Sequence, residues 1–159
     1  MVTSDQFRQV MGSFATGITV VTTKGRDEKP FGLTVNSFTS VSLEPIQVLV
    51  CLDNRLSGLQ SFKDSKKFGV SILSEDQEDL SRLFAKKDSV RPASIYFDGK
   101  TGVPLLKNSL ATLECETIAI YPGGDHQIFL ANVVALDVFE KEKGPLLYFR
   151  GKYAKGIKS

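Results

Sequence analysis

Few residues of this chain suit metal binding or acid–base catalysis. His126 is the only histidine, and the two cysteines, Cys51 and Cys115, lie far apart without a C-x-x-C motif. Metal centres and hydrolytic sites need clusters of ligating side chains, or a nucleophile beside a general base. The sequence therefore predicts no metal site and no catalysis that depends mainly on proton transfer. Both cysteines are expected to be buried, reduced thiols, because free cysteine behaves as a small apolar residue.

Long apolar runs and an excess of one charge are also missing. No run approaches the roughly 20 apolar residues that span a membrane, and residues 1–8 lack the charged-then-apolar order of a signal peptide. The net charge is +2, with Lys and Arg scattered among acidic residues. These features favour a cytoplasmic protein and indicate no nucleic-acid or membrane partner. Neither a G-x-G-x-x-G motif after a strand nor a P-loop is present, so neither nucleotide site is predicted.

The chain has the size and composition of one globular domain. Its 159 residues are 42% apolar and 24% charged, which is ordinary for a globular protein with a full core. No internal repeat, linker or low-complexity tract interrupts it. We therefore expect a single domain over residues 1–159.

The pattern of apolar residues predicts mostly strands. A first helix is expected with Ser4 as its N-cap and one apolar stripe made of Phe7, Val10, Met11 and Phe14. The β-branched run 18–23 predicts a strand, and the turn at 24–30 returns 31–35 as its antiparallel partner. Ser57 and Ser74 each open a Ser-x-x-Gln capping box, which predicts two short helices. Further strands are expected at 46–52, 68–73, 110–120, 127–140 and 145–150, with a turn at 121–125.

These elements favour an antiparallel barrel. Six or seven strands and about three short helices occur without regular βαβ alternation. That order is typical of a mainly β fold with helices at the ends of the barrel, and not of a doubly wound sheet.

Two polar segments are candidates for ligand contact. Residues 36–42 carry small hydroxyl and amide side chains between two strands. They either satisfy a corner of the barrel or admit a planar, heteroatom-rich ligand close to the backbone. Residues 54–57, Asn-Arg-Leu-Ser, precede a helix whose start favours an anion. The alternative is that Ser57 is a plain helix cap beside a solvated Arg55. Lys86 and Lys87 either add positive charge or form an ordinary hydrated surface.

Several segments, taken in order, resemble the flavin-reductase-like family of FMN-binding split barrels. They are residues 14–22 (FATGITVVT), 34–43 (TVNSFTSVSL), 48–52 (VLVCL), 102–106 (GVPLL), 113–115 (LEC), 124–130 (GDHQIFL) and 145–153 (PLLYFRGKY). The resemblance covers nearly the whole chain. It implies an antiparallel Greek-key split β-barrel that binds FMN, with a few short helices, and a homodimer whose flavin site lies near the subunit interface.

The resemblance also implies a function and a set of site residues. The expected activity is NAD(P)H-dependent reduction of FMN or FAD, by hydride transfer from NADH or NADPH, with reduced flavin passed to a partner flavin-dependent monooxygenase. His126 is expected to seat the nicotinamide; on its residues alone it also reads as a turn residue bonded to Asp125. Alternatives are a flavoredoxin-type carrier that passes electrons from FMN to a protein partner, and a barrel without flavin. The flavin-contacting candidates are Thr34, Asn36, Ser37, Ser40, Val41, Ser42, Asp53, Arg55, Ser57, Lys86 and Tyr153.

Overall fold

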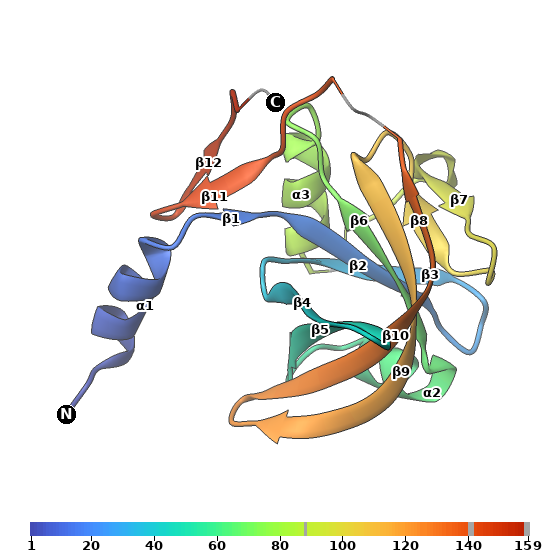
Figure 1. Ribbon diagram of the computed structural model, residues 1–159, viewed down its shortest axis with the longest axis horizontal. Helices are drawn as coiled ribbons and strands as arrows, with labels where there is room; N and C mark the ends of the chain where they lie inside the picture. Colours follow the sequence, from blue (N-terminus) through green and yellow to red (C-terminus); the bar gives the residue numbers. More distant parts are fainter. Residues whose placement is uncertain (88, 140–141, 158–159) are drawn as a thin grey trace.

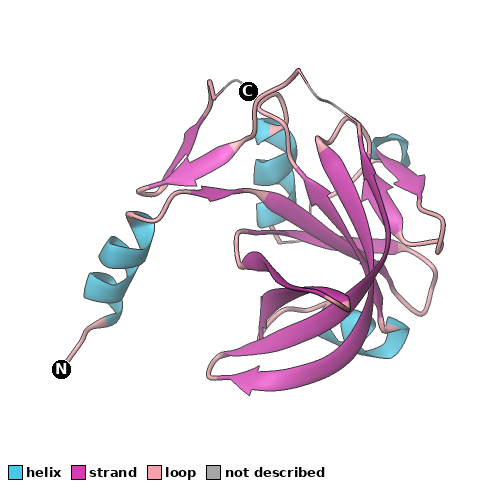
Figure 2. Cartoon of the chain, in the orientation of Figure 1, coloured by secondary structure: helices cyan, strands magenta, loops and turns pink. Residues whose placement is uncertain are grey.

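The computed structural model describes residues 1–87, 89–139 and 142–157. Its largest element is a seven-stranded sheet in the order β3-β2-β6-β9-β10-β5-β4 (Figure 1; Figure 2). Every neighbouring pair in this sheet is antiparallel, which confirms a mainly β chain with antiparallel sheets. The strands are β2 (Thr19–Lys24), β3 (Pro30–Val35), β4 (Phe38–Leu43), β5 (Ile46–Asp53), β6 (Lys67–Ile72), β9 (Ala111–Gly123) and β10 (His126–Val138).

Two small sheets and a few short helices accompany the large sheet. The first small sheet has the order β1-β11-β12, and the second pairs β7 with β8. In Figure 1, α1 stands away from the large sheet, whereas α2 and α3 pack on it. The bounds are α1 (Ser4–Gly12), β1 (Thr16–Gly17), α2 (Leu59–Ser65), α3 (Glu78–Ala85), the 3-10 turn η1 (Ala93–Ile95), β7 (Tyr96–Asp98), β8 (Pro104–Leu106), β11 (Leu147–Phe149) and β12 (Lys152–Ala154).

The two edge strands of the large sheet are consecutive in sequence. β3 ends at Val35 and β4 begins at Phe38, so Asn36 and Ser37 alone join opposite edges. Three Cα–Cα steps span at most about 11 Å, and the sheet therefore curls until its edges approach one another here. Among the described residues, no ladder joins β3 to β4. Closure into a barrel thus stays a prediction.

Two clusters of buried side chains form the core. The larger one includes Phe62 of α2, whose ring centroid lies 6.4 Å from that of Phe68 and 6.3 Å from that of Phe129. Val21 of β2 belongs to this cluster, whereas its neighbour Val20 belongs to the smaller one beneath α3. Because successive side chains of a strand point to opposite faces, β2 is buried on both. This explains its unbroken run of β-branched residues.

The first helix forms where it was predicted, but its N-cap is a different residue and its apolar stripe is exposed. Thr3, not Ser4, is the N-cap: its hydroxyl accepts the Gln6 N–H at 3.2 Å, and the Gln6 side chain accepts the Thr3 N–H at 3.0 Å. Thr3 has the extended backbone that a cap requires, whereas Ser4 is already helical. The stripe lies exposed on this chain, with exposed fractions of 60% for Phe7, 69% for Val10, 48% for Met11 and 68% for Phe14.

The segment interpreted as a polar loop, residues 36–42, is mostly a strand. Only Asn36 and Ser37 are outside strands, and β4 pairs with β5 from Phe38 opposite Val50 onward, with a bulge near Val41. An edge strand that is largely exposed carries no alternation of apolar and polar residues. The run of serine and threonine therefore resembled a loop.

Neither predicted capping box forms in full. α2 begins after Gly58, which makes no side-chain cap, so Ser57 lies before the helix. The Leu59 N–H instead bonds to the Leu56 carbonyl at 3.1 Å in a tight turn, which delays the helix start. Before α3, the Gln77 side chain accepts the Ser74 N–H at 3.1 Å, as a capping box requires. The Ser74 hydroxyl is buried and donates to the Asn108 carbonyl instead.

The other predicted elements are confirmed within small shifts of their ends. The hairpin β2–β3 forms as predicted. The turn expected at 121–125 is shorter, because residues 121–123 continue β9 and only Gly124 and Asp125 turn. The strand predicted to end at Glu140 is described as far as Val138, and Glu140 lies outside the described residues. No described helix is long and apolar enough to cross a membrane.

Candidate functional site

A cleft lies where the end of β3, the last turn of α3 and the small sheet β11–β12 meet. It consists of two adjoining cavities that share Thr34 and Ala85. The first, here called the cation cavity, has a volume of 420 Å³ and is lined by Ser57, Lys86, Lys87 and Arg91 among others. The second, here called the tyrosine cavity, has a volume of 190 Å³ and is lined by Ile18, Thr34, Val35, Asn36, Ser81, Ala85, Tyr148 and Tyr153.

The packing of α3 on β3 creates this cleft. Alternate β3 residues (Phe31, Leu33 and Val35) pack against the larger core cluster, so Gly32 and Thr34 lie on the opposite face. A Cβ at Gly32 would lie 3.0 Å from the Phe84 ring and 2.9 Å from the Thr22 methyl group, so a side chain here would push α3 or its neighbours aside. Thr34 then donates a 2.6 Å hydrogen bond to the Ser81 carbonyl of α3.

Tyr153 is held firmly at the wall of the tyrosine cavity. Its hydroxyl shares a 2.9 Å hydrogen bond with the Ser81 hydroxyl, and the Arg82 guanidinium lies 4.6 Å from the centre of its ring. The Tyr148 ring packs on it edge to face, with centroids 5.5 Å apart. Two aromatic rings and a hydroxyl therefore stand at fixed positions beside the cavity, as a planar ligand requires.

The cation cavity favours a phosphate group. Lys86, Lys87 and Arg91 line it together with the hydroxyls of Thr34, Ser57 and Ser89, and its described lining contains no Asp or Glu. Ammonium and guanidinium groups form charge-assisted hydrogen bonds to phosphate oxygens, and hydroxyls add neutral donors. Arg82 differs from these cations, because it donates to the Glu78 carboxylate at 2.7 Å and is largely neutralised by it.

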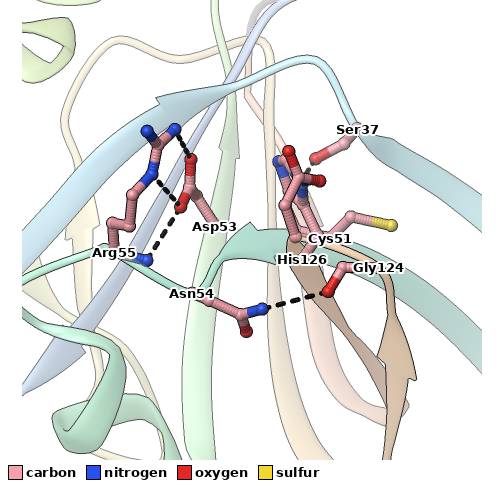
Figure 3. Close-up of polar contacts among 8 residues, drawn as sticks. Ser37, Cys51, Asp53, Asn54, Arg55, Gly124 and His126 are labelled. Atoms are coloured by element: carbon pink, nitrogen blue, oxygen red, sulfur yellow. Dashed lines mark hydrogen bonds and ion pairs between the residues drawn. The ribbon is translucent and has the colours of Figure 1, made fainter.

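A second polar group lies at the adjacent ends of β5 and β10, where Asp53 is the ladder partner of His126 (Figure 3). Three Arg55 donors contact the Asp53 carboxylate at 2.8 to 3.1 Å. The hydrogen bonds from Arg55 hold the pKa of Asp53 far below its usual range. Asn54 donates to the Gly124 carbonyl at 3.2 Å, which joins the two strand ends.

The imidazole of His126 has a defined orientation. Its Nδ1 lies 2.7 Å from the Asp125 carboxylate, and this hydrogen bond lowers the pKa of Asp125. An ionised carboxylate only accepts, so Nδ1 carries the proton and Nε2 is left for another partner. The side chain is 41% exposed. In the described part of the chain, no group of three or more His, Cys, Asp or Glu is placed to hold a metal ion.

Ser37 connects the tyrosine cavity to this second group. Its carbonyl accepts the Cys51 N–H at 3.2 Å, and its hydroxyl donates to the Cys51 carbonyl at 2.8 Å (Figure 3). Its neighbour Asn36 lines the cavity, while Cys51 lies two residues before Asp53. Cys51 is half-buried, against the expectation of full burial, because a strand near the edge is covered less completely than Cys115 in the middle of the sheet.

The comparison with known protein families decides the affiliation of the chain. The family model described as "Flavin reductase like domain" matches residues 11–156. The chain belongs to this flavin reductase-like family. The resemblance that was seen in the sequence is thereby confirmed, over nearly the whole length that carried it.

Several relatives of this flavin reductase-like chain are named as reductases. It is 36% identical over 154 residues to an "NADH-dependent flavin reductase" of Rhodococcus sp, covering 96% of this chain and 86% of the relative. It is 38% identical over 149 residues to the reductase subunit HsaB of a flavin-dependent monooxygenase of Mycobacterium tuberculosis, covering 92% and 79%. Among solved structures, the Streptomyces globisporus NADH:FAD oxidoreductase SgcE6, in complex with NAD and FAD fragments, matches with a TM-score of 0.89, 36% identity and coverage of 96% and 92%.

The predicted site residues of this family member divide into three groups. Thr34, Asn36, Ser57, Lys86 and Tyr153 converge on the cleft. Asp53, Arg55 and His126 form the second group, to which Ser37 leads. Ser40, Val41 and Ser42 lie on edge strand β4 and line neither cavity.

Sequence reasoning missed several polar and aromatic residues of the cleft. Ser81, Arg91 and Tyr148 line the cleft but were not among the candidates. Ser81 lies inside a helix, where a serine carries no recognisable signal. Arg91 lies in a polar stretch that indicated only a loop. Tyr148 belongs to the segment 145–153 that carried the resemblance, which is the one signal that pointed to it.

Proposed function

We propose that this protein is an NAD(P)H-dependent flavin reductase that transfers a hydride from a nicotinamide to FMN or FAD. The reduced flavin then serves a partner flavin-dependent monooxygenase, as the names of the relatives suggest. The observation that carries the proposal is the junction of two cavities in a member of this family. A cavity lined by three cations, suited to phosphate, opens beside one with a fixed aromatic wall, suited to a ring system.

The residues of the cleft fit a flavin by their chemistry. Ser57 and Lys86 are proposed to hold the phosphate, because both line the cation cavity. Thr34, Asn36 and Tyr153 are proposed to border the ring, which they keep oriented and shielded from water. When bound, the flavin supplies the acceptor for the hydride, so the chain itself needs no acid–base pair. This agrees with a sequence that contains a single histidine.

Ser40, Val41, Ser42, Asp53 and Arg55 are given a lesser part in the proposal. The Arg55 guanidinium is already satisfied by Asp53, and the β4 residues line neither cavity. Ser37 is proposed as a positioning residue. Its two bonds to Cys51 fix the connection on which Asn36 is carried.

One preparation of the protein tests the proposed activity against the carrier alternative. The visible spectrum is recorded, and NADH or NADPH oxidation is then followed with and without added FMN or FAD. A reductase oxidises the nucleotide catalytically when flavin is present. A protein that retains flavin but oxidises neither nucleotide is a carrier, and a protein that binds no flavin contradicts the whole proposal.

His126 is proposed to seat the nicotinamide through its free Nε2. We expect His126→Ala to lower turnover or raise the nucleotide KM by roughly tenfold, and to change flavin affinity little. Asn54→Ala is the matched control, because it removes a hydrogen bond to the same turn without touching the imidazole. Equal kinetic losses in both variants would contradict the proposal that His126 seats the nicotinamide. So would a lower melting temperature of His126→Ala with unchanged kinetics, because His126 would then only stabilise the turn.

A homodimer is proposed from the exposed apolar surface of the chain. The apolar stripe of α1 and of the residues just after it leaves Phe7, Val10 and Phe14 exposed by 60% or more. Monomeric proteins seldom leave such contiguous apolar surface in water, and a second copy would cover it. Phe7→Glu should shift the mass measured by light scattering toward the monomer, whereas Gln9→Glu on the same helix should not. A monomeric wild type would refute the dimer.

Three broader features complete the proposal. Residues 1–159 are proposed to fold as one domain, and the curled sheet to form the split barrel of the resemblance. The two-residue connection between the edge strands supports that barrel. A cytoplasmic location follows the sequence prediction. Limited proteolysis tests whether the chain is one domain, and an experimental structure tests whether the barrel is closed. Cell fractionation tests the location.

A further inference from the structure

We propose that this chain prefers the dinucleotide FAD to FMN, with Arg91 holding the second phosphate and a neighbouring cavity taking the AMP half. The inference rests on the proposed flavin site and names which flavin that site takes. It is carried by the position and surroundings of Arg91, which the proposed FMN contacts leave unused.

Arg91 lies between two cavities. Besides the cation cavity, it lines a cavity of 530 Å³, here called the hairpin cavity, next to the β2–β3 turn and β7. Ser89 also lines both cavities. A ligand whose phosphate occupies the cation cavity therefore has a direct continuation past Arg91. The volume of the hairpin cavity lies within the range of about 300–1,000 Å³ typical of small-molecule sites.

The guanidinium of Arg91 is positioned but not neutralised. Its central carbon lies 4.6 Å from the centre of the Phe84 ring and 5.9 Å from that of Phe31, so two aromatic rings hold it. Its Nε is buried and has no hydrogen-bond partner within the described residues. In the same part of the chain, no carboxylate forms an ion pair with Arg91.

Such an arginine is suited to a pyrophosphate. A guanidinium presents its N–H donors in a flat fork that matches two phosphate oxygens. An unpaired buried donor is costly, and a phosphate oxygen would satisfy it. FMN has one phosphate, for which Ser57 and Lys86 suffice. A second phosphate, linked to the first, would reach the shared boundary of the two cavities, where Arg91 lies.

The lining of the hairpin cavity matches an adenosine. Tyr96, Phe97 and Pro30 offer apolar faces on which a purine can stack. The Tyr96 hydroxyl is buried without a hydrogen-bond partner among the described residues, so it is available to a ring nitrogen. The Asp98 carboxylate, of which one oxygen lies 3.1 Å from the Lys24 ammonium, and the Glu28 carboxylate can accept hydrogen bonds from ribose hydroxyls. Stacking groups and acceptors thus lie on the far side of Arg91 from the cation cavity.

The test compares FAD with FMN on the same protein. Fluorescence titration should give a dissociation constant at least tenfold lower for FAD than for FMN in the wild type. Arg91→Met, which keeps an apolar contact with Phe84, should raise the dissociation constant of FAD at least tenfold more than it raises that of FMN. Arg26→Met is the matched control, because it removes the same charge from the β2–β3 turn but lines neither cavity. It should change neither constant.

A competition on the wild type keeps the inference testable if the variant fails to fold. AMP at millimolar concentration should raise the apparent dissociation constant of FAD but not that of FMN. Equal affinities for the two flavins, equal losses in Arg91→Met, or AMP without effect on FAD would each overturn the inference. If FMN still binds and supports NADH oxidation, the proposed function stands without it. If neither flavin binds, both proposals fail.

Discussion

Replacing Ser57 and Arg55 one at a time should show that they act differently, although both belong to residues 54–57, which the sequence offered as one anion-binding segment. Ser57 lines the cation cavity, so its hydroxyl is available to a phosphate oxygen. A hydrogen bond to a charged group contributes about 1.5–3 kcal/mol. Ser57→Ala should therefore weaken FMN binding roughly ten- to hundredfold. Riboflavin has no phosphate, so its binding should change less than threefold.

Arg55 should behave differently, because the structure already gives its charge a partner. Its backbone N–H, Nε and Nη2 all donate to Asp53, and its side chain is 83% exposed. The lowered pKa of Asp53 keeps that carboxylate ionised at neutral pH, where it neutralises the guanidinium. An exposed, paired charge acts weakly on a phosphate, because water and dissolved ions screen it. Arg55→Ala should weaken FMN binding less than about threefold.

The assay titrates both variants with FMN and riboflavin while flavin fluorescence is followed. Lys86→Ala serves as a positive control, since it removes a cation that lines the same cavity as Ser57. The reasoning fails if Ser57→Ala weakens both flavins equally, because the residue would then act through the fold. It also fails if Arg55→Ala weakens FMN binding as much as Ser57→Ala does.

Three further predictions concern stability and thiol chemistry. Burial raises the pKa of Glu114, but hydrogen bonds from Thr101 and Lys100 outweigh burial and lower that pKa overall. Glu114→Gln should therefore lower the free energy of unfolding, measured in urea at pH 7, by about 1–3 kcal/mol. Since the pKa of Glu114 is lower in the folded than in the unfolded protein, its contribution to stability is complete above about pH 4.3 and is lost as pH falls through the folded pKa. If Glu114→Gln destabilised the protein as much at pH 3 as at pH 7, this reasoning would be refuted. Burial raises the pKa of Cys115 to about 12, so a thiol reagent at pH 8 should modify Cys115 only after unfolding; rapid labelling in the folded state would contradict this. A Cβ at Gly58 would overlap the Phe31 ring, so Gly58→Ala should lower the melting temperature, and an unchanged value would show that the ring moves aside.

The strands that the sequence predicted are those with a strong local signal. The run 18–23 and the apolar stretches 46–52 and 68–73 are rich in β-branched or apolar residues and fold as strands with small shifts of their ends. The edge strand β4 was missed, because its serine and threonine side chains face outward and carry no alternation. Helix starts shifted by a residue or more where a hydroxyl bonded elsewhere, as Ser74 does with Asn108.

Part of the candidate site follows from the sequence, because five of the candidate residues line the cleft: Thr34, Asn36, Ser57, Lys86 and Tyr153. Ser57 and Lys86 are far apart in sequence but line one cavity, so both stay candidates for the phosphate. Arg91 could not have been found in this way. Its position depends on rings contributed by β3 and α3, and contacts between distant segments leave no local pattern. The sequence also did not reveal that Asp53 is the partner of Arg55. Asp53 neutralises the Arg55 guanidinium, in competition with a ligand, only after the turn has folded and brought the two side chains together.

The wall of the cleft that carries Tyr148 and Tyr153 has its own consequence for folding. The β11–β12 hairpin is attached to α3 by the hydrogen bond between Ser81 and Tyr153, and the Leu146 N–H just before β11 bonds to the Leu73 carbonyl. It also joins the N-terminal segment through a two-residue ladder with β1, in which Thr16 pairs with Tyr148, and through the Arg150 N–H bonded to the Gly12 carbonyl. These contacts join segments near opposite ends of the chain, and such contacts form late because long loops must close first. A short ladder and single hydrogen bonds attach this hairpin, whereas long ladders hold the large sheet, so the hairpin is expected to open more often than the sheet. The fixed positions of Tyr148 and Tyr153 described above are those of its closed form. A ligand in the cleft would favour the closed form. Amide hydrogens of residues 147–154 should therefore exchange faster than those of β2, and should slow selectively when flavin is added.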